Sequence, residues 1–326
     1  MIPADKIRKQ LKNALDRTDF KSLGKKYEGK VRDNYTQGNK RVIITTDRIS
    51  AFDRVLCTIP YKGQVLNQMA VFWFENTKDI VKNHMIHAPD PNVMVVEECN
   101  PLPIEMVVRE YVTGVTTTSI WYNYKQGVRN FCGNRLPEGM KKDQKLPKPI
   151  LTPSTKAQKG GHDESLSCDE IVKRKLVSRE DMEQINEISL KLFERGKDVA
   201  AKQGVILVDT KYEFGKLGEE IILIDEIHTP DSSRFWFADT YQALFNACKE
   251  QRKIDKEYVR TWLADRGFIG EGAIPPIPDD VRVEAARLYI EAYEKVTGLA
   301  FKVYDKPILK RIKENLHKYG YLMEEK

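Results

Sequence analysis

The chain has 326 residues, of which 41% are hydrophobic and 31% charged, and this composition is typical of soluble globular proteins rather than of disordered, collagen-like or membrane-spanning chains. Its formal net charge is +6, but acidic and basic residues are interleaved, and no basic stripe of the kind that binds duplex nucleic acid is evident. The small positive excess is equally compatible with an anionic metabolite as the partner.

The cysteines and histidines form no recognisable metal-binding or disulfide pattern. The five cysteines are scattered without a CxxC pair, and the five histidines include no HExxH pair. We therefore expect reduced structural thiols and surface imidazoles rather than disulfides, a structural zinc site or a zinc hydrolase. Residues 1–6 lack the apolar core of a signal peptide, and no run reaches about 18 apolar residues, so we expect a cytoplasmic protein.

The first third of the chain predicts a short opening helix followed by a mostly antiparallel sheet. Apolar residues at helical spacing predict helices over residues 5–17 and near 64–81. Short strand-like runs bounded by turn residues predict five strands, at residues 26–28, 31–35, 41–45, 92–98 and 104–112.

The remaining two thirds predict a larger mixed region. Residues 129–168 show no sustained periodicity, which predicts a long functional loop. Ser178 followed by Asp181 resembles a capping box and predicts the start of a helix that Gly204 can end. Two strands and three helices are predicted after it, at 205–213, 220–226, 256–265, 279–297 and 306–318. The order of elements predicts an α+β fold with a small, mostly antiparallel lobe over 1–108 and a larger mixed α/β lobe over 109–326.

A predicted hairpin near the middle of the chain carries carboxylates. Alternation along the first strand puts Asp209, Lys211 and Glu213 on one face, and a loop at 215–219 would place Asp209 directly opposite Asp225. Carboxylates that face each other repel unless a cation lies between them. Either Mg²⁺, which binds one or two carboxylates together with water and phosphates, or Lys211 must compensate. The alternative is an exposed hairpin with a solvated polar end, although both strands begin with apolar residues.

A glycine turn precedes a pair of basic residues near the start of the chain. Gly29 lies at the turn, and Lys30 and Arg32 lie on the same side of the strand that follows. Such a hairpin can bring backbone amides and two cations onto a triphosphate, although it is neither a Walker A loop nor a GxGxxG motif. Taken alone, the pattern favours a basic surface turn.

Three further polar clusters follow predicted strands or lie in the long loop. The segment 46–53 carries Arg48, Ser50 and Asp53 at a strand end, where sites are often built. Arg109 is followed by hydroxyl residues at 116–119, a combination that suits a phosphomonoester, and Arg234 is a second candidate for that role; each arginine could equally be an ordinary surface residue. The segment 152–164 gathers hydroxyls, a lysine and carboxylates, which predicts a lid or substrate loop.

Together these segments resemble the family of phosphoribosylaminoimidazole-succinocarboxamide synthases, or SAICAR synthetases. The matching segments are YEGKVRD at 27–33, TDRISAFD at 46–53, GQVLN at 63–67, VVREYVTG at 107–114, LTPSTK at 151–156, HDE at 162–164, VDTKYEFG at 208–215 and DEIHTPDSSRFW at 225–236. The resemblance implies the family's fold, distantly similar to kinases and ATP-grasp enzymes. It also implies a ligase that joins L-aspartate to the carboxylate of carboxyaminoimidazole ribonucleotide (CAIR) in purine biosynthesis, with ATP consumed through a carboxyl-phosphate intermediate.

The resemblance also implies roles for individual residues. Those implied for ATP are Gly29, Lys30, Arg32, Glu98, Glu213 and Asp225, with residues 95–98 next to adenine and with Glu213 and Asp225 also holding Mg²⁺. Lys211 and Asp209 are the implied catalytic residues, near the transferred phosphoryl group and the ribose. The implied substrate-binding residues are Arg48, Ser50, Asp53, Arg109, Ser119, Arg234 and, for aspartate, Ser154, Lys156, His162, Asp163 and Glu164. Residues 115–118 separate Gly114 from Ser119, whereas shorter members have serine directly after this glycine, so the hydroxyl that meets phosphate stays open.

Two other readings compete with the ligase. A kinase-like small-molecule phosphotransferase would suit the same glycine hairpin and carboxylates, but HRD, DFG and APE motifs are absent from the sequence. A nucleic-acid-binding module rests only on the net charge. The partners expected here are small-molecule substrates, with no nucleic acid and no membrane, and a monomer is slightly favoured over a homodimer.

Overall fold

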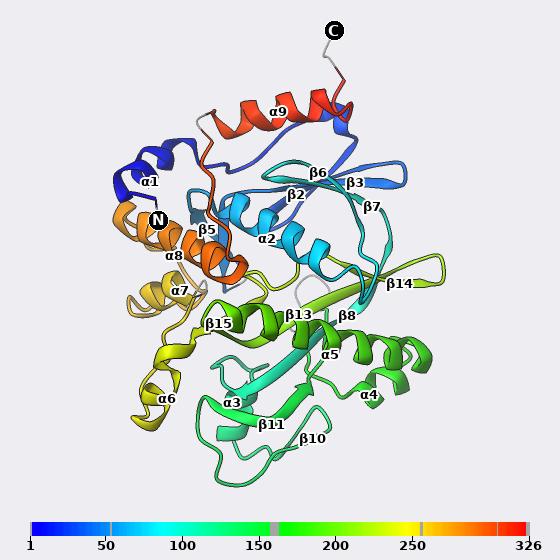
Figure 1. The fold of residues 1–326 in the computed structure, drawn as a ribbon, viewed down its shortest axis with the longest axis vertical. Coiled ribbons are helices and arrows are strands. Elements are labelled where there is room, and N and C mark those ends of the chain that lie inside the picture. The colour runs from blue at the N-terminus through cyan, green and yellow to red at the C-terminus, as the bar shows by residue number, and fades with distance from the viewer. Residues whose placement is uncertain (1, 53, 157–162, 255–256, 305, 324–326) are drawn as a thin grey trace.

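The computed structural model describes residues 2–52, 54–156, 163–254, 257–304 and 306–323. Helices and antiparallel sheets form two stacked parts, each built around its own sheet (Figure 1), which confirms the α+β prediction. Asp53 and His162, two of the predicted site residues, lie outside the described residues. None of the helices formed by described residues is long and apolar enough to cross a membrane.

Five antiparallel strands form the first sheet, in the order β1-β2-β3-β7-β6. Their bounds are β1 Lys25–Glu28, β2 Arg32–Gln37, β3 Lys40–Thr45, β6 Met85–Asp90 and β7 Val93–Glu97. Because side chains alternate along a strand, Ile43 of β3 packs into the large core beside helix α2 (Lys62–Asn76), whereas Val42 and Ile44 pack on the opposite face. This confirms the antiparallel sheet predicted for the first third, with one correction: the predicted strand 104–112 belongs to the second sheet, and β6, which was not predicted, forms the edge instead.

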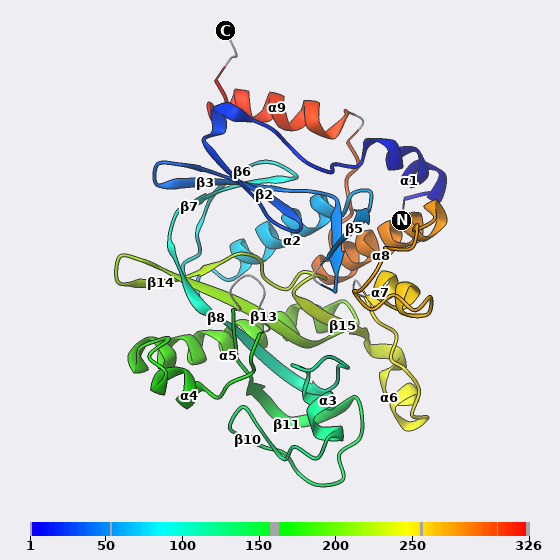
Figure 2. The same ribbon diagram turned by 180° about the vertical axis from the view of Figure 1, so that it is seen from behind.

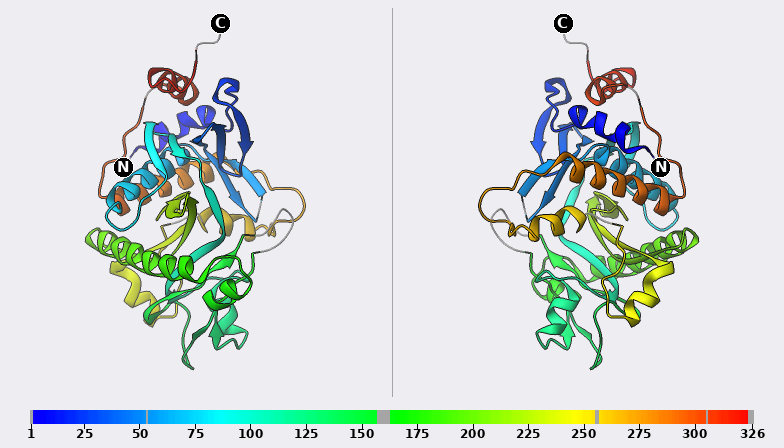
Figure 3. Two further views of the ribbon diagram at one scale, coloured as in Figure 1. Left: turned by 90° about the vertical axis from the view of Figure 1, so that its right-hand side faces the viewer. Right: turned by 90° about the vertical axis from the view of Figure 1, so that its left-hand side faces the viewer.

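The last helix returns to the first sheet. Helix α9 (Ile308–Lys318) covers the face that α2 leaves open, with Ile308, Ile312 and Leu316 in one cluster with Val42 and Ile44. Its Arg311 pairs with Asp90 of β6 at 3.0 Å, and both side chains are nearly inaccessible. Figure 3 shows this helix at one end of the molecule and the region of residues 120–140 at the other.

The second sheet has the order β11-β8-β13-β14, with β12 added to β8 and β15 added to β13. Its strands are β8 Asn100–Val112, β11 Gln144–Leu151, β12 Ser154–Thr155, β13 Val205–Leu217, β14 Glu220–Ile224 and β15 Ser233–Phe237. Helix α5 (Arg179–Lys202) packs along β13 (Figure 2). It begins where predicted, because Ser178 accepts a hydrogen bond from the Asp181 amide at 3.0 Å. Strand β8 runs across residue 108, and the division into lobes at this residue stays a prediction.

Shorter elements connect and cover these sheets. They are α1 Ala4–Gln10, η1 Leu11–Asn13, η2 Lys21–Leu23, β4 Arg48–Ala51, β5 Arg54–Thr58, α3 Ile120–Lys125, β9 Asn130–Phe131, β10 Asn134–Arg135, α4 Cys168–Lys173, α6 Ala238–Asn246, α7 Glu257–Ala264 and α8 Asp279–Thr297. All five cysteines are free thiols, as predicted. The prediction of surface imidazoles is wrong for His84 and His228, which are buried.

The prediction of one long loop over 129–168 is wrong, because this segment contains four strands and the start of α4. Strand β11 includes Pro147 and Pro149, which hid its periodicity. Prolines fit there because β11 is an edge strand, on which an outward-facing amide needs no ladder partner. Leu146 and Ile150 of this strand pack into a small separate core with α3.

The predicted register of the carboxylate hairpin is also wrong. Strand β13 continues to Leu217, opposite Glu220, and only residues 218 and 219 form the turn. Gly218 has φ 62°, the left-handed conformation that such tight turns require and that glycine adopts at low cost. Glu213 therefore pairs with Ile224, and Asp225 lies just beyond the end of β14.

Helix α9 offers a test of the packing. We expect Ile312→Ala to lower the free energy of unfolding by about 2–5 kcal/mol, because a fully buried side chain would leave a cavity. Leu309 lies on the same helix with 47% of its surface exposed, and Leu309→Ala should change stability by less than about 0.5 kcal/mol. Urea unfolding followed by circular dichroism measures both, and equal losses would contradict the packing of α9 on the sheet.

Candidate active site

A pocket of about 240 Å³ is lined by residues from both sheets. The glycine hairpin supplies residues 29–32, the end of β7 and its link to β8 supply residues 96–99, and Lys156, Glu213 and Asp225 line the other side. Segments far apart in the sequence thus meet because the two sheets face each other. Seven residues predicted to contact ATP or metal or, for Lys156, aspartate therefore border one cavity: Gly29, Lys30, Arg32, Glu98, Lys156, Glu213 and Asp225.

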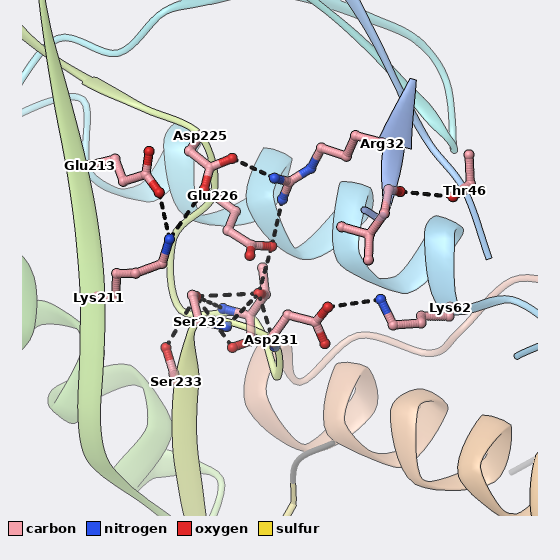
Figure 4. Close-up of polar contacts among 12 residues, drawn as sticks. Arg32, Thr46, Lys62, Lys211, Glu213, Asp225, Glu226, Asp231, Ser232 and Ser233 are labelled. Carbon is pink, nitrogen blue, oxygen red and sulfur yellow. Dashed lines mark hydrogen bonds and ion pairs between the residues drawn. The ribbon is translucent and has the colours of Figure 1, made fainter. Parts of the chain in front are cut away.

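Three carboxylates surround the Lys211 ammonium: those of Glu213 and Asp225 (Figure 4), and that of Glu105 on β8, whose Oε1 accepts a hydrogen bond from Nζ at 3.0 Å. Glu213 lies two residues further along β13 and therefore on the same face, and its Oε1 is 2.5 Å from Lys211 Nζ. Asp225, with φ 67°, turns back after β14 and brings Oδ2 to 3.8 Å from the same nitrogen. Lys156 Nζ contacts the second oxygen of Glu213 at 2.5 Å, and Arg32 pairs with the second oxygen of Asp225.

This arrangement gives Glu213 and Asp225 different proton affinities. Burial alone would raise the pKa of Glu213, but the cations of Lys211 and Lys156 lower it well below its usual value. Burial raises the pKa of Asp225 to about 7, against the opposite effects of Arg32 and Lys211. Burial would lower the pKa of Lys211, yet the neighbouring carboxylates raise it well above the usual value. Glu213 is therefore ionised at neutral pH and is balanced by the ammonium groups of Lys211 and Lys156.

The carboxylates fit a nucleotide-dependent magnesium site. No group of three or more histidine, cysteine, aspartate or glutamate side chains within the described ranges could hold a metal ion. Two carboxylates without nitrogen or sulfur ligands suit Mg²⁺, which completes its shell with water and substrate phosphates. The side chains therefore offer only part of a magnesium coordination shell, and phosphate oxygens and water would have to supply the remaining ligands.

Arg48 lies behind the glycine hairpin. Its guanidinium is nearly inaccessible and donates hydrogen bonds to the carbonyl oxygens of Gly29 at 3.0 Å and Lys30 at 3.1 Å. It also donates to Asp33 Oδ1 at 2.7 Å. The contacts found for Arg48 thus fix the hairpin backbone from the inside. Ser50 lies nearby in β4, and the predicted substrate contacts of both residues stay predictions.

A second cationic cluster lies on the neighbouring strands of the large sheet. Asp209 of β13 stands opposite Arg109 of β8 and Arg234 of β15, and its Oδ2 lies 3.2 Å and 2.7 Å from their nitrogens. Ser119 belongs to the same place, because a Cβ added to Gly114 would lie 2.5 Å from Ser119 Oγ and 3.0 Å from an Arg234 nitrogen. Asp209 therefore pairs with these arginines rather than with Asp225. The cluster presents two guanidinium groups and a hydroxyl, a set suited to a phosphomonoester.

The segment predicted to meet aspartate divides into separate environments. Lys156 lies in the pocket against Glu213, whereas Glu164 pairs with Arg174 at an exposed position, 2.7 Å away. Asp163 is also exposed, and Ser154 is buried in β12 against β8. The structure thus does not bring these residues together at one point.

Four residues of the site region were missed by the sequence reasoning, and one of them is Glu105 of β8, which accepts from Lys211. Arg41 of β3 forms a bidentate ion pair with Glu98, in which two guanidinium nitrogens lie 2.5 and 2.8 Å from the two carboxylate oxygens. Both residues line the pocket. Glu226 accepts from Arg32 at 2.7 Å, and its position directly after Asp225 was the available signal. Lys62 pairs with Asp231 next to this region. For Arg41 and Lys62, no local pattern distinguishes them from surface cations.

The electrostatics of Glu213 predict a pH effect on stability. Because its pKa is lower in the folded than in the unfolded chain, its ion pairs stabilise the fold above the usual value of 4.5 and are lost as pH falls below it. We expect Glu213→Gln to lower the free energy of unfolding by about 1.5–3 kcal/mol at pH 7, with a difference from wild type that shrinks below pH 4.5. Exposed Glu220 provides the control, since Glu220→Gln should have little effect at either pH. A difference for Glu213→Gln that is constant between pH 7 and pH 3.5 in urea titrations would contradict the assignment.

Comparisons with known proteins agree with this geometry. The family described as SAICAR synthetase matches residues 25–273. A putative phosphoribosylaminoimidazole-succinocarboxamide synthase 2 from Agrobacterium fabrum is 49% identical over 94% of this chain and 98% of that protein. The corresponding synthase from Legionella pneumophila strain Paris is 48% identical over 91% and 96%. The structure of the SAICAR synthase from Saccharomyces cerevisiae complexed with SAICAR superposes with a TM-score of 0.76 at 32% identity, over 89% of this chain and all of that one. A SAICAR synthetase in complex with ADP superposes with a TM-score of 0.64 at 29% identity, over 86% of this chain and all of that one. The chain belongs to the SAICAR synthetase family.

Proposed function

We infer that this chain is an ATP-dependent carbon–nitrogen ligase of purine biosynthesis, which joins L-aspartate to the carboxylate of CAIR and releases SAICAR, ADP and phosphate. Family membership supports the reaction. The observation that carries the assignment to this pocket is the convergence of Glu213 and Asp225 on Lys211, beside a glycine hairpin with two basic residues.

The chemistry requires activation of the CAIR carboxylate, because a carboxylate is a poor electrophile toward an amine. Its oxygen attacks the γ-phosphorus of ATP, and the bond from that phosphorus to the β–γ bridging oxygen breaks, so that ADP leaves. The aspartate amine then attacks the acyl carbon, loses a proton, and inorganic phosphate departs. Phosphoryl transfer depends mainly on positioning and charge neutralisation, and Lys211 is the cation proposed to meet the transferred group.

At the nucleotide end, Gly29, Lys30 and Arg32 would hold the phosphates, and residues 95–98 with Glu98 would border adenine. In the structure Arg32 pairs with Asp225 and Glu226. A triphosphate would draw this guanidinium away from the two carboxylates. Arg32 is thus held near its working position before the nucleotide arrives.

Glu213 and Asp225 would hold Mg²⁺ once the nucleotide is bound. The ion would supply positive charge that offsets the developing charge on the phosphate oxygens. Lys211 then exchanges a carboxylate partner for a phosphoryl oxygen. Because these side chains already balance one another, the exchange needs only short movements within one cluster.

The ribonucleotide phosphate would occupy the cluster of Arg109, Ser119 and Arg234, with Asp209 near the ribose. Asp209 lies between the two guanidinium groups and keeps both aimed at one place. For the amino-acid substrate, the proposal retains Ser154, Lys156, His162, Asp163 and Glu164, together with Arg48, Ser50 and Asp53 as further substrate contacts. The contact of Lys156 with Glu213 favours a place for it next to the reacting carboxylate.

Two further proposals concern the protein as a whole: it acts in the cytoplasm, and it acts as a monomer. Both sheets contribute to one large core within a single chain, which is compatible with a monomer. Light scattering after size-exclusion chromatography measures the molar mass directly, and a mass of twice the chain mass would contradict the monomer.

Substrate omission tests the function. ADP release should require ATP, CAIR and L-aspartate together, and turnover that persists without aspartate or without CAIR would reject the ligase. Glu213→Gln and Asp225→Asn should each lower kcat/KM for ATP by about a hundredfold or more, since each removes charge that orients the reacting phosphate. Glu220→Gln, at the far end of the same hairpin, should keep wild-type kinetics.

The half-formed metal site predicts that metal binding depends on nucleotide. Calorimetric titration of the free protein with Mn²⁺, a substitute for Mg²⁺, should show no saturable binding below about 1 mM, whereas titration in the presence of ADP should. Glu213→Gln should weaken binding in the second titration. Saturable binding without nucleotide that Glu213→Gln and Asp225→Asn leave unchanged would place the metal elsewhere.

A further inference from the structure

Lys62 is the only buried lysine among the residues that the structure describes, with no exposed surface. Its Nζ lies 2.8 Å from Asp231 Oδ2 (Figure 4) and 5.4 Å from the ring centre of Tyr289. Tyr289, on α8, donates to the other Asp231 oxygen at 2.7 Å. Removing an ammonium and a carboxylate from water is costly and brings little net stability, so this pair calls for an explanation beyond packing.

The backbone of Lys62 is fixed to the first sheet. It is the first residue of α2, where the amide of Gly63 donates to Asp47 Oδ1 at 2.9 Å. A Cβ on Gly63 would lie 2.3 Å from the carbonyl oxygen of Thr45, which means that the helix start is pressed against the end of β3. Lys62 therefore extends from a rigid point.

Asp231 lies in the middle of the connection 225–234, which is attached to both ends of the site. At its start, Arg32 contacts Asp225 and Glu226; at its end, Arg234 contacts Asp209. Thr229 links Glu226 to Asp231 within the connection. Its hydroxyl donates to Glu226 at 2.8 Å and accepts from the Asp231 amide at 3.3 Å. The same connection thus supplies a proposed metal ligand and a proposed phosphate ligand.

We propose that Lys62 is a positioning residue, whose buried pair with Asp231 holds the connection 225–234 in place while substrates bind at both of its ends. The inference rests on the proposed function. Anionic substrates compete for Arg32 and Arg234, so the contacts of Arg32 with the start of the connection and of Arg234 with Asp209 weaken during turnover. The pair of Lys62 and Asp231 is out of reach of substrate and persists, so that Asp225 and Arg234 keep a fixed separation.

The test compares two buried ion pairs of similar exposure. Lys62→Met removes the positive charge of the pair with Asp231 and keeps a side chain of similar length. Arg311→Met breaks the pair with Asp90 under α9, on the other face of the first sheet. Both should lower the midpoint of thermal unfolding, because each leaves a buried carboxylate without its cation. Only Lys62→Met should also weaken ADP binding in calorimetry and raise KM for CAIR, each by about tenfold or more.

Two further variants keep the test decisive if Lys62→Met does not fold. Asp231→Asn keeps the shape of the side chain and an oxygen for Tyr289, and it should affect the same two constants in the same direction. In the double variant Lys62→Met/Asp231→Asn, the second change should add less than it does alone, because both remove one interaction.

The outcomes separate the positioning role of Lys62 from the ligase assignment. Equal effects of Lys62→Met and Arg311→Met on ADP affinity and on KM for CAIR would contradict the positioning role of Lys62. An effect of Lys62→Met on only one of these two ligands would contradict it as well. Turnover of the wild-type enzyme in the absence of aspartate would contradict the ligase assignment. The ADP titrations need neither CAIR nor aspartate, so they still test the positioning role of Lys62 at the nucleotide end of the connection.

Discussion

The candidate site depends on a balance of charge: three carboxylates, those of Glu213, Glu105 and Asp225, share the Lys211 ammonium. Burial and mutual repulsion favour the protonated forms of these carboxylates. With Lys211 and Lys156 present, Glu213 stays ionised, whereas the pKa of Asp225 remains raised to about 7. The cluster therefore exists before any substrate binds, and nucleotide binding can proceed by exchange of partners rather than by construction of a site.

The fold supplies this balance through its sheet topology. Strand β13 lies between β8 and β15 and places Asp209 beside Arg109 and Arg234, while the next side chains on the same face reach the nucleotide pocket. One strand thus carries both the cluster proposed to bind the ribonucleotide phosphate and the cluster proposed to bind the metal. Their separation is fixed by the rise of a strand, which suits a reaction whose two substrates must meet in line. Behind them, Arg48 holds the backbone of the glycine hairpin, and Lys62 pairs with the Asp231 carboxylate.

Much of the fold could be predicted from the sequence because its strands and helices have clear periodicity. Helix α5 was predicted from its cap and apolar stripe, and the resemblance of short motifs led to the family. The hairpin register was not accessible in the same way, since a loop of two residues and one of five fit the same polar segment, and the left-handed glycine at 218 decides between them. Strand β11 was missed because its prolines are tolerated only on an edge, and edge position is a property of the assembled sheet.

The site residues that belong to short sequence motifs could be predicted, whereas those whose role depends on burial in the folded chain could not. Lys30, Arg32, Glu213 and Asp225 do line one pocket, although the geometry first drawn for Asp209 was wrong. By contrast, nothing near Lys62 in the sequence shows that a lysine at the start of a helix is fully buried, since its partner lies 169 residues away.

A crystal structure with ADP and Mn²⁺ would show whether Glu213 and Asp225 share the metal, because anomalous scattering locates Mn²⁺ without reference to the surrounding atoms. We expect one metal peak within about 2.0–2.3 Å of oxygens of both Glu213 and Asp225 and of a phosphate oxygen, with Lys211 moved toward the phosphate. A peak that contacts neither carboxylate, or Lys211 still bound between them beside a fully occupied nucleotide, would contradict this expectation.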